Sequence, residues 1–527
     1  MLQEDYMEAI RLCGLRRPKK NNFKEWVKKA MAEFIDDLKK VDITLDDLDS
    51  LKIIHISGTK GKGSVTAFCE SILRAHGLKT GMYSSPHLIE LRERIRINGL
   101  PLSRNDFSKY FFDVYKKLDA ISERFRLLTM VALHAFLQEK VDVVILEVGR
   151  GGTYDCTNVI RRPTATGINL IDFDHMHVLG DTLAKIAWHK AGICKPGRPA
   201  FTVPQSKEAV DTILARAKEL DAPIHLVPEL DDYDWQGQPK KLGISGEYQK
   251  RNASLAIQLC RAWINEHKSN LTSFEDVHTN ASVEYSSLTA PAFKLPDAFI
   301  KGLRNCYWPA RAQIIKRENV TYYMDGAHTQ LSIKACAEWF EQASSEEELL
   351  LGKRCVKVLL FNVTRERDPK ELMVDLLPCN FAGATFSPNV VYGDSSQSLM
   401  DRSFLGVSIE EEHDVCKQNR QAWQSLEEER ERNPDSPLEA SSSKTEPDSP
   451  KYVKFECVKH ALQWLSCGKD SHMPNPRSED PTPPQSIMEA DHVQVLVTGS
   501  LYLIGCVIHV LDLDVITKGI KHDAHAC

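Results

Sequence analysis

Apolar residues follow two kinds of pattern that alternate along the first half of the chain. Short runs rich in β-branched residues, typical of buried strands, lie at 53–57, 79–84, 141–148, 164–170, 200–203 and 223–227. Longer segments with apolar residues at helical spacing lie at 23–40, 64–73, 104–118, 125–139, 181–192, 206–220 and 248–268. Because strands and helices alternate at this interval, the pattern predicts a mostly parallel sheet covered by helices on both faces.

The pattern stops over residues 269–300, which we expect to be irregular, and then restarts. Strand-like runs follow at 320–324, 356–361, 390–391 and 492–497, with a helix before residue 343 and another after the last strand. We therefore predict an α/β protein with a mostly parallel sheet domain at 1–299 and a smaller C-terminal α/β domain at 300–527. Residues 427–452 and 469–486 are acidic or rich in serine and proline, and we expect disordered insertions there, because they lack the apolar surface that would offset ordering.

A glycine-rich loop lies between the first strand and the next helix, in the sequence LKIIHISGTKGKGS. Glycine lets backbone N–H groups converge on a phosphate, and the start of a helix adds partial positive charge. The residues that would line the phosphate are Gly58, Thr59, Gly61, Lys62, Gly63 and Ser64. Gly63 separates Lys62 from Ser64, unlike the common G-x-x-x-x-G-K-[ST] string, so a glycine turn with the solvated lysines Lys60 and Lys62 is the alternative. The flanking strand and helix favour the phosphate loop (P-loop).

Composition narrows the function classes. The 527 residues are 42% apolar and 27% charged, with a formal net charge of −6, so nothing favours a nucleic-acid partner, and we expect a monomer without a membrane span. The 14 cysteines include no C-x-x-C pair, which argues against zinc and redox motifs and for reduced thiols in the cytoplasm. Acidic residues near the N-terminus are unlike a secretory or transit peptide, and Met1 and Met7 are both plausible starts. An upstream start would add a mitochondrial form.

Motifs along nearly the whole chain occur together in one known superfamily. In chain order they are GTKGKGS, YSSPHL, RERIRING, VILEVGRGGTYDCTN, DFDHMHVLGDTLAKIAWHKAGI, GEYQKRNASLAI, WPARAQ, DGAHT, FNVTRERDP and VLVTGSLYLIG. With them the sequence resembles the Mur ligase superfamily and, within it, the folylpolyglutamate synthase family of eukaryotic type. The resemblance implies a ligase that uses ATP and Mg²⁺ to add L-glutamate to the γ-carboxyl group of reduced folate and its polyglutamates, through an acyl phosphate.

The resemblance also implies roles for residues of the first domain. Ser85, Glu147 and His175 match the magnesium ligands, which suits the preference of Mg²⁺ for oxygen donors. The alternatives are a turn hydroxyl for Ser85, a salt bridge for Glu147 and a packed loop histidine for His175. Lys190 matches a lysine that carries a carbamate in some members, or else is an ordinary helix lysine. Lys62 and Lys190 are thus the catalytic candidates of this domain, and a monovalent cation is a further candidate cofactor.

In the second domain the resemblance implies contacts with nucleotide and glutamate. Arg311 and Asp325 match nucleotide contacts, as does Asn252 in the first domain. Arginine suits phosphate because its planar fork donates two hydrogen bonds, and a salt bridge is the alternative for Arg311 and Asp325. His328 and Ser500 match positions linked to glutamate binding and acyl transfer.

Three features depart from the family pattern. Arg150 stands where an aliphatic residue is usual, Tyr248 where histidine is common, and the loop at 120–126 is short. The loop borders the folate side in the family, so the preferred folate is left open. Dihydrofolate synthase, which acts on dihydropteroate, is therefore an alternative function, and a nucleotide-binding pseudoenzyme is another.

Overall fold

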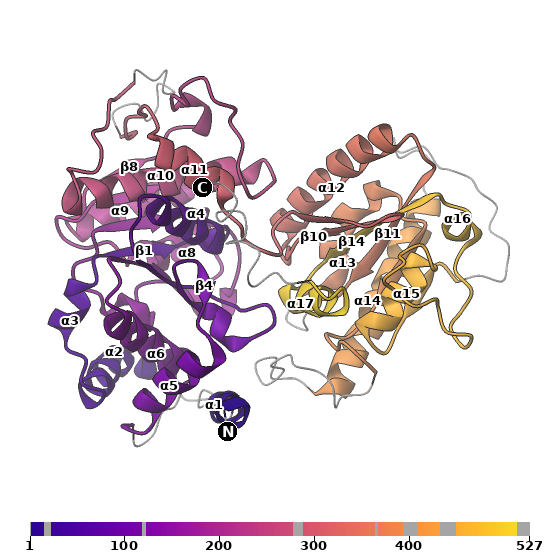
Figure 1. Cartoon of the computed structure of the whole chain (residues 1–527), viewed down its shortest axis with the longest axis horizontal. Coiled ribbons are helices and arrows are strands. Elements are labelled where there is room, and N and C mark those ends of the chain that lie inside the picture. The colour runs from indigo at the N-terminus through magenta and orange to yellow at the C-terminus, as the bar shows by residue number, and fades with distance from the viewer. Residues whose placement is uncertain are drawn as a thin grey trace. The chain divides into compact units, whose positions relative to one another are not determined.

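The chain folds into two α/β units, the first ending at Trp308 and the second beginning at Pro309. The computed structural model describes residues 2–14, 23–118, 123–277, 288–363, 367–393, 408–432 and 450–513 (Figure 1). Within these ranges, no helix is both long and apolar enough to cross a membrane.

Unit 1 is built on an eight-stranded sheet in the order β4-β3-β2-β5-β1-β6-β7-β8. The strands are β1 (Ile53–Ser57), β2 (Thr80–Tyr83), β3 (Ile95–Ile97), β4 (Leu100–Pro101), β5 (Val143–Glu147), β6 (Ala165–Ile168), β7 (Ala200–Thr202) and β8 (Ile224–Leu226). The six strands from β2 to β8 in this order are parallel, while β3 and β4 form an antiparallel hairpin at the edge. The register pairs Ile56 with Glu147 and Ser57 with Ile168, so β1, β5 and β6 end at one edge of the sheet.

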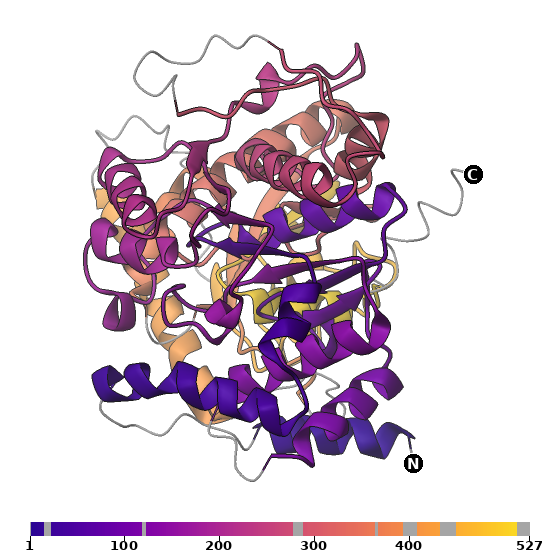
Figure 2. The ribbon, with the colours of Figure 1, turned by 90° about the vertical axis from the view of Figure 1, so that its left-hand side faces the viewer.

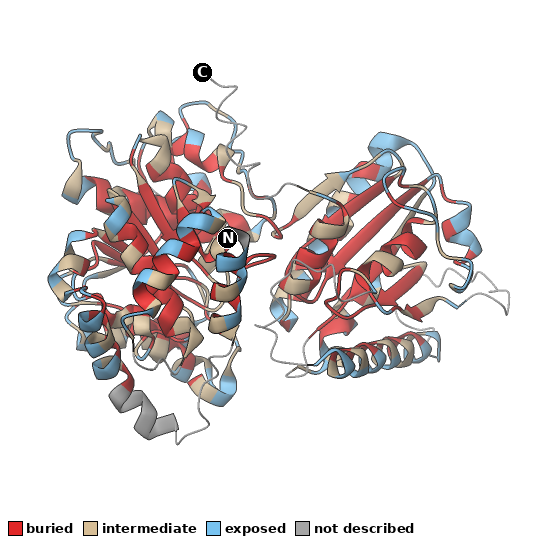
Figure 3. Ribbon diagram, turned by 60° about the horizontal axis from the view of Figure 1, so that its bottom comes forward, coloured by how far each residue is buried: buried red, intermediate tan, exposed pale blue. Residues whose placement is uncertain are grey.

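Helices cover both faces of this sheet, as its sequence pattern predicts. One face packs against α4 (Lys62–Ala75), α10 (Tyr248–His267) and α11 (Asp297–Asn305). The other carries α6 (Arg124–Glu139), α8 (Leu183–Ala191) and α9 (Lys207–Glu219) (Figure 2). The central strand β1 shows the result, since Ile54 and Ile56 join the core beneath α4 while His55 faces the opposite side. All five residues of β1 are buried, which explains its near-continuous apolar run. Figure 3 shows that the strands of both units are mostly buried.

The remaining helices of unit 1 lie before or beside the sheet. They are α1 (Leu2–Gly14), α2 (Phe23–Lys40), α3 (Leu45–Ser50), α5 (Arg104–Tyr115) and the one-turn α7 (Met176–Leu179). Within the described ranges, short 3-10 turns lie at η1 (Leu91–Arg94), η2 (Cys156–Val159), η3 (Leu230–Asp232) and, in unit 2, η4 (Val374–Cys379). Helix α2 has the bounds that the periodicity predicts.

Unit 2 contains a six-stranded sheet in the order β13-β12-β11-β14-β10-β9. The strands are β9 (Gln313–Lys316), β10 (Val320–Met324), β11 (Cys355–Phe361), β12 (Gly383–Phe386), β13 (Tyr452–Lys454) and β14 (His492–Thr498). All neighbours are parallel except β9, which runs antiparallel to β10. Helices α12 (Gln330–Leu351), α13 (Pro369–Met373) and α14 (Ile409–Arg432) share one core with the sheet. The other helices are α15 (Val458–Ser466), α16 (Gln485–Met488) and α17 (Leu501–Val510).

The structure corrects the sequence-based expectation at three places in unit 2. Residues 390–391 are not a strand, because the carbonyl groups of Val390 and Val391 accept hydrogen bonds from the first N–H groups of α15. Residues 427–432 are the last turns of α14 rather than part of an insertion. Residues 469–486 are ordered against the unit, while 433–449 lie outside the described residues.

Buried polar contacts hold residues 469–486 in place. The Tyr322 hydroxyl donates to Asp470 at 2.8 Å, and the Trp464 indole N–H donates to the Pro481 carbonyl at 2.7 Å. Asp470 and Met473 are buried. A segment with few apolar residues is thus ordered through hydrogen bonds that its composition does not reveal.

Candidate active site

The glycine loop of unit 1 is held against the segment that follows β6. The backbone N–H groups of Thr59 and Lys60 both donate to the Leu170 carbonyl, at 2.8 and 3.1 Å. The Thr59 hydroxyl and Asp172 exchange two further hydrogen bonds of 3.1 Å each. Gly58 has a φ of +137°, and a Cβ there would lie 2.8 Å from the Asn169 Cβ, so only glycine fits. The strand, glycine loop and helix predicted from the sequence are all present.

Helix α4 begins directly at the end of this loop. Its N-cap is Gly61, with a φ of +72°, and no side chain of the described residues caps the N–H groups of its first turn. Ser64, in that turn, is 1% exposed, and its hydroxyl has no hydrogen-bond partner among the described residues. A helix start with unsatisfied donors and a buried hydroxyl is a site that an anion can occupy.

A buried amide network connects this loop with α10. The Asn169 Nδ2 donates to the Lys60 carbonyl at 2.8 Å and to the Asn252 Oδ1 at 2.7 Å. The Asn252 amide in turn donates to Gln249 at 2.8 Å. A Cβ at Gly61 would collide with the amides of Asn169 and Asn252. The structure therefore places Asn252 against the glycine loop, and Asn169 belongs to the same network although the sequence pattern does not point to it.

Lys62, Glu147 and Ser85 come together from α4, the end of β5 and the segment after β2. The Lys62 ammonium lies 3.9 Å from a carboxylate oxygen of Glu147, whose side chain is 3% exposed. The other Glu147 oxygen accepts the backbone N–H of Ser85 at 3.1 Å. A buried carboxylate is costly without a cationic partner, and at this strand end Lys62 supplies one.

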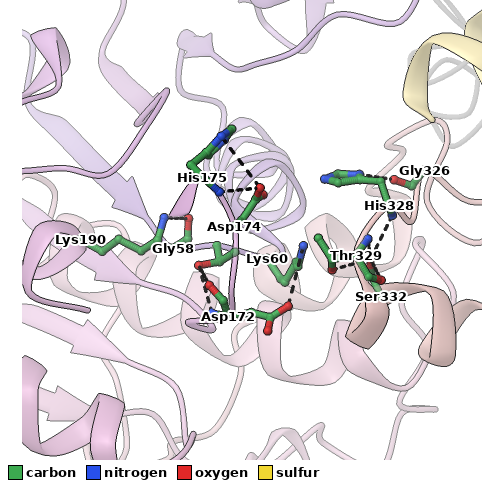
Figure 4. Close-up of polar contacts among 11 residues, drawn as sticks. Gly58, Lys60, Asp172, Asp174, His175, Lys190, Gly326, His328, Thr329 and Ser332 are labelled. Atoms are coloured by element: carbon green, nitrogen blue, oxygen red, sulfur yellow. Dashed lines mark hydrogen bonds and ion pairs between the residues drawn. The ribbon is translucent and has the colours of Figure 1, made fainter. Parts of the chain in front are cut away.

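His175 stands one residue before α7 on the loop that follows β6. Its backbone N–H donates to the Asp174 carboxylate at 2.9 Å, and its ring Nδ1 lies 3.9 Å from the same carboxylate (Figure 4). Burial lowers the pKa of His175 to about 4, against the carboxylate of Asp174 and with the help of the cations Arg150, Lys62 and Lys190. The imidazole is therefore neutral at physiological pH, which is the form that binds metals.

Lys190 lies on α8 with its side-chain nitrogen at the glycine loop. The Nζ donates to the Gly58 carbonyl at 2.8 Å (Figure 4). The Lys190 carbonyl accepts the Ser57 hydroxyl at 2.9 Å. Burial, with the nearby Lys62 ammonium, holds the pKa of Lys190 well below its usual value. Lys190 thus supports the loop backbone, and its lowered pKa favours the neutral amine over the ammonium.

A second carboxylate of unit 1, Asp155, is also buried near these cations. It accepts the backbone N–H of Arg150 at 2.8 Å and the Thr157 hydroxyl at 2.6 Å. Burial raises the pKa of Asp155, although these hydrogen bonds and Lys62 act in the opposite direction. Arg150 itself is exposed, so its charge reaches solvent. Tyr248 begins α10, and residues 119–122 of the short loop lie outside the described residues.

In unit 2 the predicted residues lie around the carboxyl ends of β10 and β14. Asp325 follows β10, is buried, and accepts the backbone N–H of Ala312 at 2.8 Å. Ala310 and Ala312, on either side of Arg311, have φ values of +63° and +42°. Such strained backbone in non-glycine residues marks a segment that its surroundings hold in place. Ligands of parallel sheets bind at this edge.

His328 and Ser500 occupy the starts of two helices in this unit. The His328 ring Nδ1 lies 2.7 Å from the Gly326 carbonyl, and the Ser332 hydroxyl accepts the backbone N–H groups of His328 and Thr329 (Figure 4). Ser500 is the buried N-cap of α17, directly after β14, and makes no side-chain capping bond. Gly326 packs so closely that a Cβ there would lie 2.8 Å from the Arg311 guanidinium.

The predicted magnesium ligands of unit 1 are of mixed donor types. In the described part of the chain no three His, Cys, Asp or Glu side chains converge on one point. The predicted ligands are one carboxylate, one neutral imidazole and one hydroxyl. Mg²⁺ keeps several waters and takes phosphate oxygens when it binds in this way, so the donor types suit it.

Comparison with known proteins relates the chain to folylpolyglutamate synthases. No protein-family model matches it. Human mitochondrial folylpolyglutamate synthase is 39% identical over 548 residues, covering 96% of this chain and 92% of the human protein. The structure of Mycobacterium tuberculosis folylpolyglutamate synthase complexed with ADP matches with a TM-score of 0.68 and 19% identity, over 98% of this chain and 100% of that chain. The bifunctional folylpolyglutamate synthase/dihydrofolate synthase of Yersinia pestis, complexed with AMPPNP and an Mn ion, matches with a TM-score of 0.61 and 20% identity, over 94% and 100%. The predicted two-domain α/β fold is confirmed.

Proposed function

Because the chain belongs to the folylpolyglutamate synthase family, and is therefore an ATP-dependent ligase that lengthens folates with glutamate, we propose how its residues carry out the reaction. The glycine loop of unit 1 holds the triphosphate, and the reaction passes through an acyl phosphate on the γ-carboxyl group of a reduced folate. The single observation that carries this proposal is the uncapped start of α4, where the buried Ser64 hydroxyl has no partner among the described residues and Lys62 lies beside Glu147.

The chemistry requires phosphoryl transfer before the new amide bond forms. A carboxylate does not accept an amine at neutral pH, because an oxide would have to leave. Transfer of the γ-phosphoryl group makes phosphate the leaving group, and the glutamate amine then displaces it. Lys62 and the N–H groups at the start of α4 neutralise the charge on the transferring group, while Ser64 donates to a phosphate oxygen.

Ser85, Glu147 and His175 would hold Mg²⁺ in this scheme. When bound, the ion would offset negative charge on the phosphate oxygens during transfer. Glu147 lies beside the Lys62 ammonium, and burial lowers the pKa of His175 to about 4, so its imidazole is in the neutral form that binds a metal. The neutral amine of Lys190 is the form that combines with CO₂, so we include carbamylation of Lys190 in the proposal. A monovalent cation beside the phosphates belongs to the same proposal.

We assign the remaining predicted residues by their places in each unit. Asn252, Arg311 and Asp325 contact the nucleotide, and His328 and Ser500 act on glutamate and acyl transfer. The substrates are reduced folate, L-glutamate and ATP, and the protein acts as a monomer without nucleic acid. The human relative carries the word mitochondrial in its name, and we propose a mitochondrial form from an upstream start beside a cytoplasmic one.

The experiment that tests this function measures phosphate release together with glutamate chain length. Purified protein with ATP, Mg²⁺, tetrahydrofolate and glutamate should release phosphate and yield folates lengthened by glutamate, read by mass spectrometry. Full release without folate or glutamate would contradict the ligase mechanism. Dihydropteroate in place of tetrahydrofolate tests dihydrofolate synthase activity, and binding of ATP and folate without turnover would identify a pseudoenzyme.

A further inference from the structure

The indole of Trp308, the last described residue of unit 1, lies directly against the first turn of α4. A Cβ built on Gly63 would be 3.1 Å from the indole Nε1 and 3.6 Å from Cε2 and Cζ2. Gly63 does not have a positive φ, so its backbone conformation does not require glycine. The restriction at Gly63 comes from the indole, which fills the space where a side chain would begin.

The chain that leads to Trp308 is fixed along the length of α4. Helix α11 approaches α4 so closely that a Cβ on Gly302 would lie 2.5 Å from the Ile72 Cα. The Ser71 hydroxyl donates to the Gly302 carbonyl at 2.7 Å. From this anchor near the end of α4, the chain reaches the start of the same helix within six residues, at Trp308. The backbone that leads to the indole is therefore anchored near the end of α4, away from the first turn that the indole contacts.

The guanidinium of Arg96 lies over the face of the same indole. Its guanidinium carbon lies 4.9 Å from the ring centroid, within the range of a cation–π contact. Arg96 belongs to β3 and is buried, and it donates to the carbonyl groups of Glu93 and Gly99 at 3.3 and 3.1 Å. A cavity of about 20 Å³, which Arg96, Trp308, Glu70 and Arg74 help to line, adjoins the ring. This space allows the indole to shift slightly when its neighbour grows.

We propose that Trp308 is a positioning residue for the ligase reaction, because its indole sets the first turn of α4 and thereby the place of Lys62 and Ser64. The inference rests on the proposed role of the glycine loop in holding the triphosphate. It also explains why glycine separates the lysine from the serine in this loop. A side chain at residue 63 would press on the indole, so either the ring or the turn that carries both phosphate-binding groups would have to move.

A double-mutant cycle between residues 63 and 308 tests this inference. The variants are Gly63→Ala, Trp308→Leu and the pair together, with Trp263→Leu as the control for loss of a buried indole. Trp263 lies in the same core and donates to the Lys52 carbonyl at 2.8 Å. The measurements are the KM for ATP, kcat, ADP affinity by calorimetry, and thermal stability of the full chain.

We expect Gly63→Ala to raise the KM for ATP about tenfold and Trp308→Leu to raise it severalfold. The double variant should bind ATP better than Gly63→Ala alone, because leucine leaves room for the added methyl group. Trp263→Leu should lower the melting temperature and leave the KM unchanged. Effects that simply multiply in the double variant, or a Trp308→Leu variant that only loses stability, would overturn the inference.

The cycle separates this inference from the proposed function. If Lys62→Ala kept full turnover, the role of the loop itself would be wrong. If Lys62→Ala were inactive and the cycle showed independent effects, only the role of Trp308 would fail. Should Gly63→Ala not fold, Trp308→Phe provides the test, since its smaller ring should raise the KM for ATP with little loss of stability.

Discussion

The amide of Asn169 offers the sharpest test of how the phosphate loop is held in shape. It follows β6, is fully buried, and donates two hydrogen bonds, of 2.8 Å to the Lys60 carbonyl and 2.7 Å to Asn252. Asn169→Ala removes both donors and leaves the buried Asn252 Oδ1 and the half-buried Lys60 carbonyl without them. The orphaned buried acceptor costs about 1–3 kcal/mol, and loss of the half-buried hydrogen bond costs about 1 kcal/mol. We therefore expect the variant to lose about 2–4 kcal/mol of stability.

Part of that loss should appear in nucleotide binding, because one of the two acceptors belongs to the loop itself. If about half of the energy falls on the loop conformation, the KM for ATP rises about 5- to 30-fold, since 1.4 kcal/mol corresponds to a factor of ten. Asn169→Asp keeps the shape but places a carboxylate against two acceptors, so it should be at least as harmful. The assay is steady-state phosphate release at saturating folate and glutamate, with unfolding in urea measured in parallel.

Gln494 provides the matched control. It is a fully buried amide in unit 2 that also donates two hydrogen bonds, to the Ser344 carbonyl at 2.9 Å and to Glu347 at 3.2 Å. Gln494→Ala should lose stability to a similar extent and keep the KM for ATP. An Asn169→Ala variant that loses stability like Gln494→Ala, with an unchanged KM, would refute the idea that this amide shapes the loop.

Three further predictions concern Lys62, Glu147 and His55. Lys62→Ala should abolish turnover without unfolding the protein, because the lysine is partly exposed and the loop backbone is untouched; circular dichroism checks the fold, and normal turnover would show that the loop is assigned wrongly. Glu147→Gln should raise the Mg²⁺ concentration needed for half-maximal rate, since a neutral amide attracts the ion less, and an unchanged requirement would contradict the ligand role. Burial lowers the pKa of His55 from 6.5 to about 3, so the unfolded chain takes up a proton that the native protein does not, and stability falls as pH decreases from about 6.5 towards 3. His55→Asn should remove this contribution. As the pH falls from 8 to 5, the free energy of unfolding measured in urea should therefore decrease less for the variant than for the unmodified protein. Equal decreases for the two proteins would refute the assignment.

The parallel strands were predictable because their signal is local. Runs such as 320–324 and 141–148 contain enough β-branched residues to be buried on both faces, and β10 (Val320–Met324) and β5 (Val143–Glu147) lie within them. Two candidate site residues could be placed for the same reason, because Glu147 ends one of these strands and Asp325 follows the other. The hairpin of β3 and β4 was missed in a loop rich in arginine. Its Asn98-Gly99 turn, with φ values of +50° and +77°, is the signal that could have located it.

Contacts between distant segments could not be predicted from local patterns. Asn169 looks like any amide after a strand, and its importance depends on Lys60 and Asn252, which reach it only in the folded unit. The restriction at Gly63 depends in the same way on Trp308. The hydrogen-bond partners of residues 469–486 belong to β10 and α15. The prediction of disorder from low apolar content was therefore wrong for that segment.

The ordered segment at 469–486 matters for anyone who shortens this protein to improve its crystals. Its low apolar content suggests a disordered loop that could be removed. A shortened chain would, however, leave the Tyr322 hydroxyl and the Trp464 indole N–H without the acceptors that this segment provides. Each such group would cost about 1–3 kcal/mol, enough to reduce the yield of folded material. Shortened variants should therefore keep residues 469–486, despite their low apolar content.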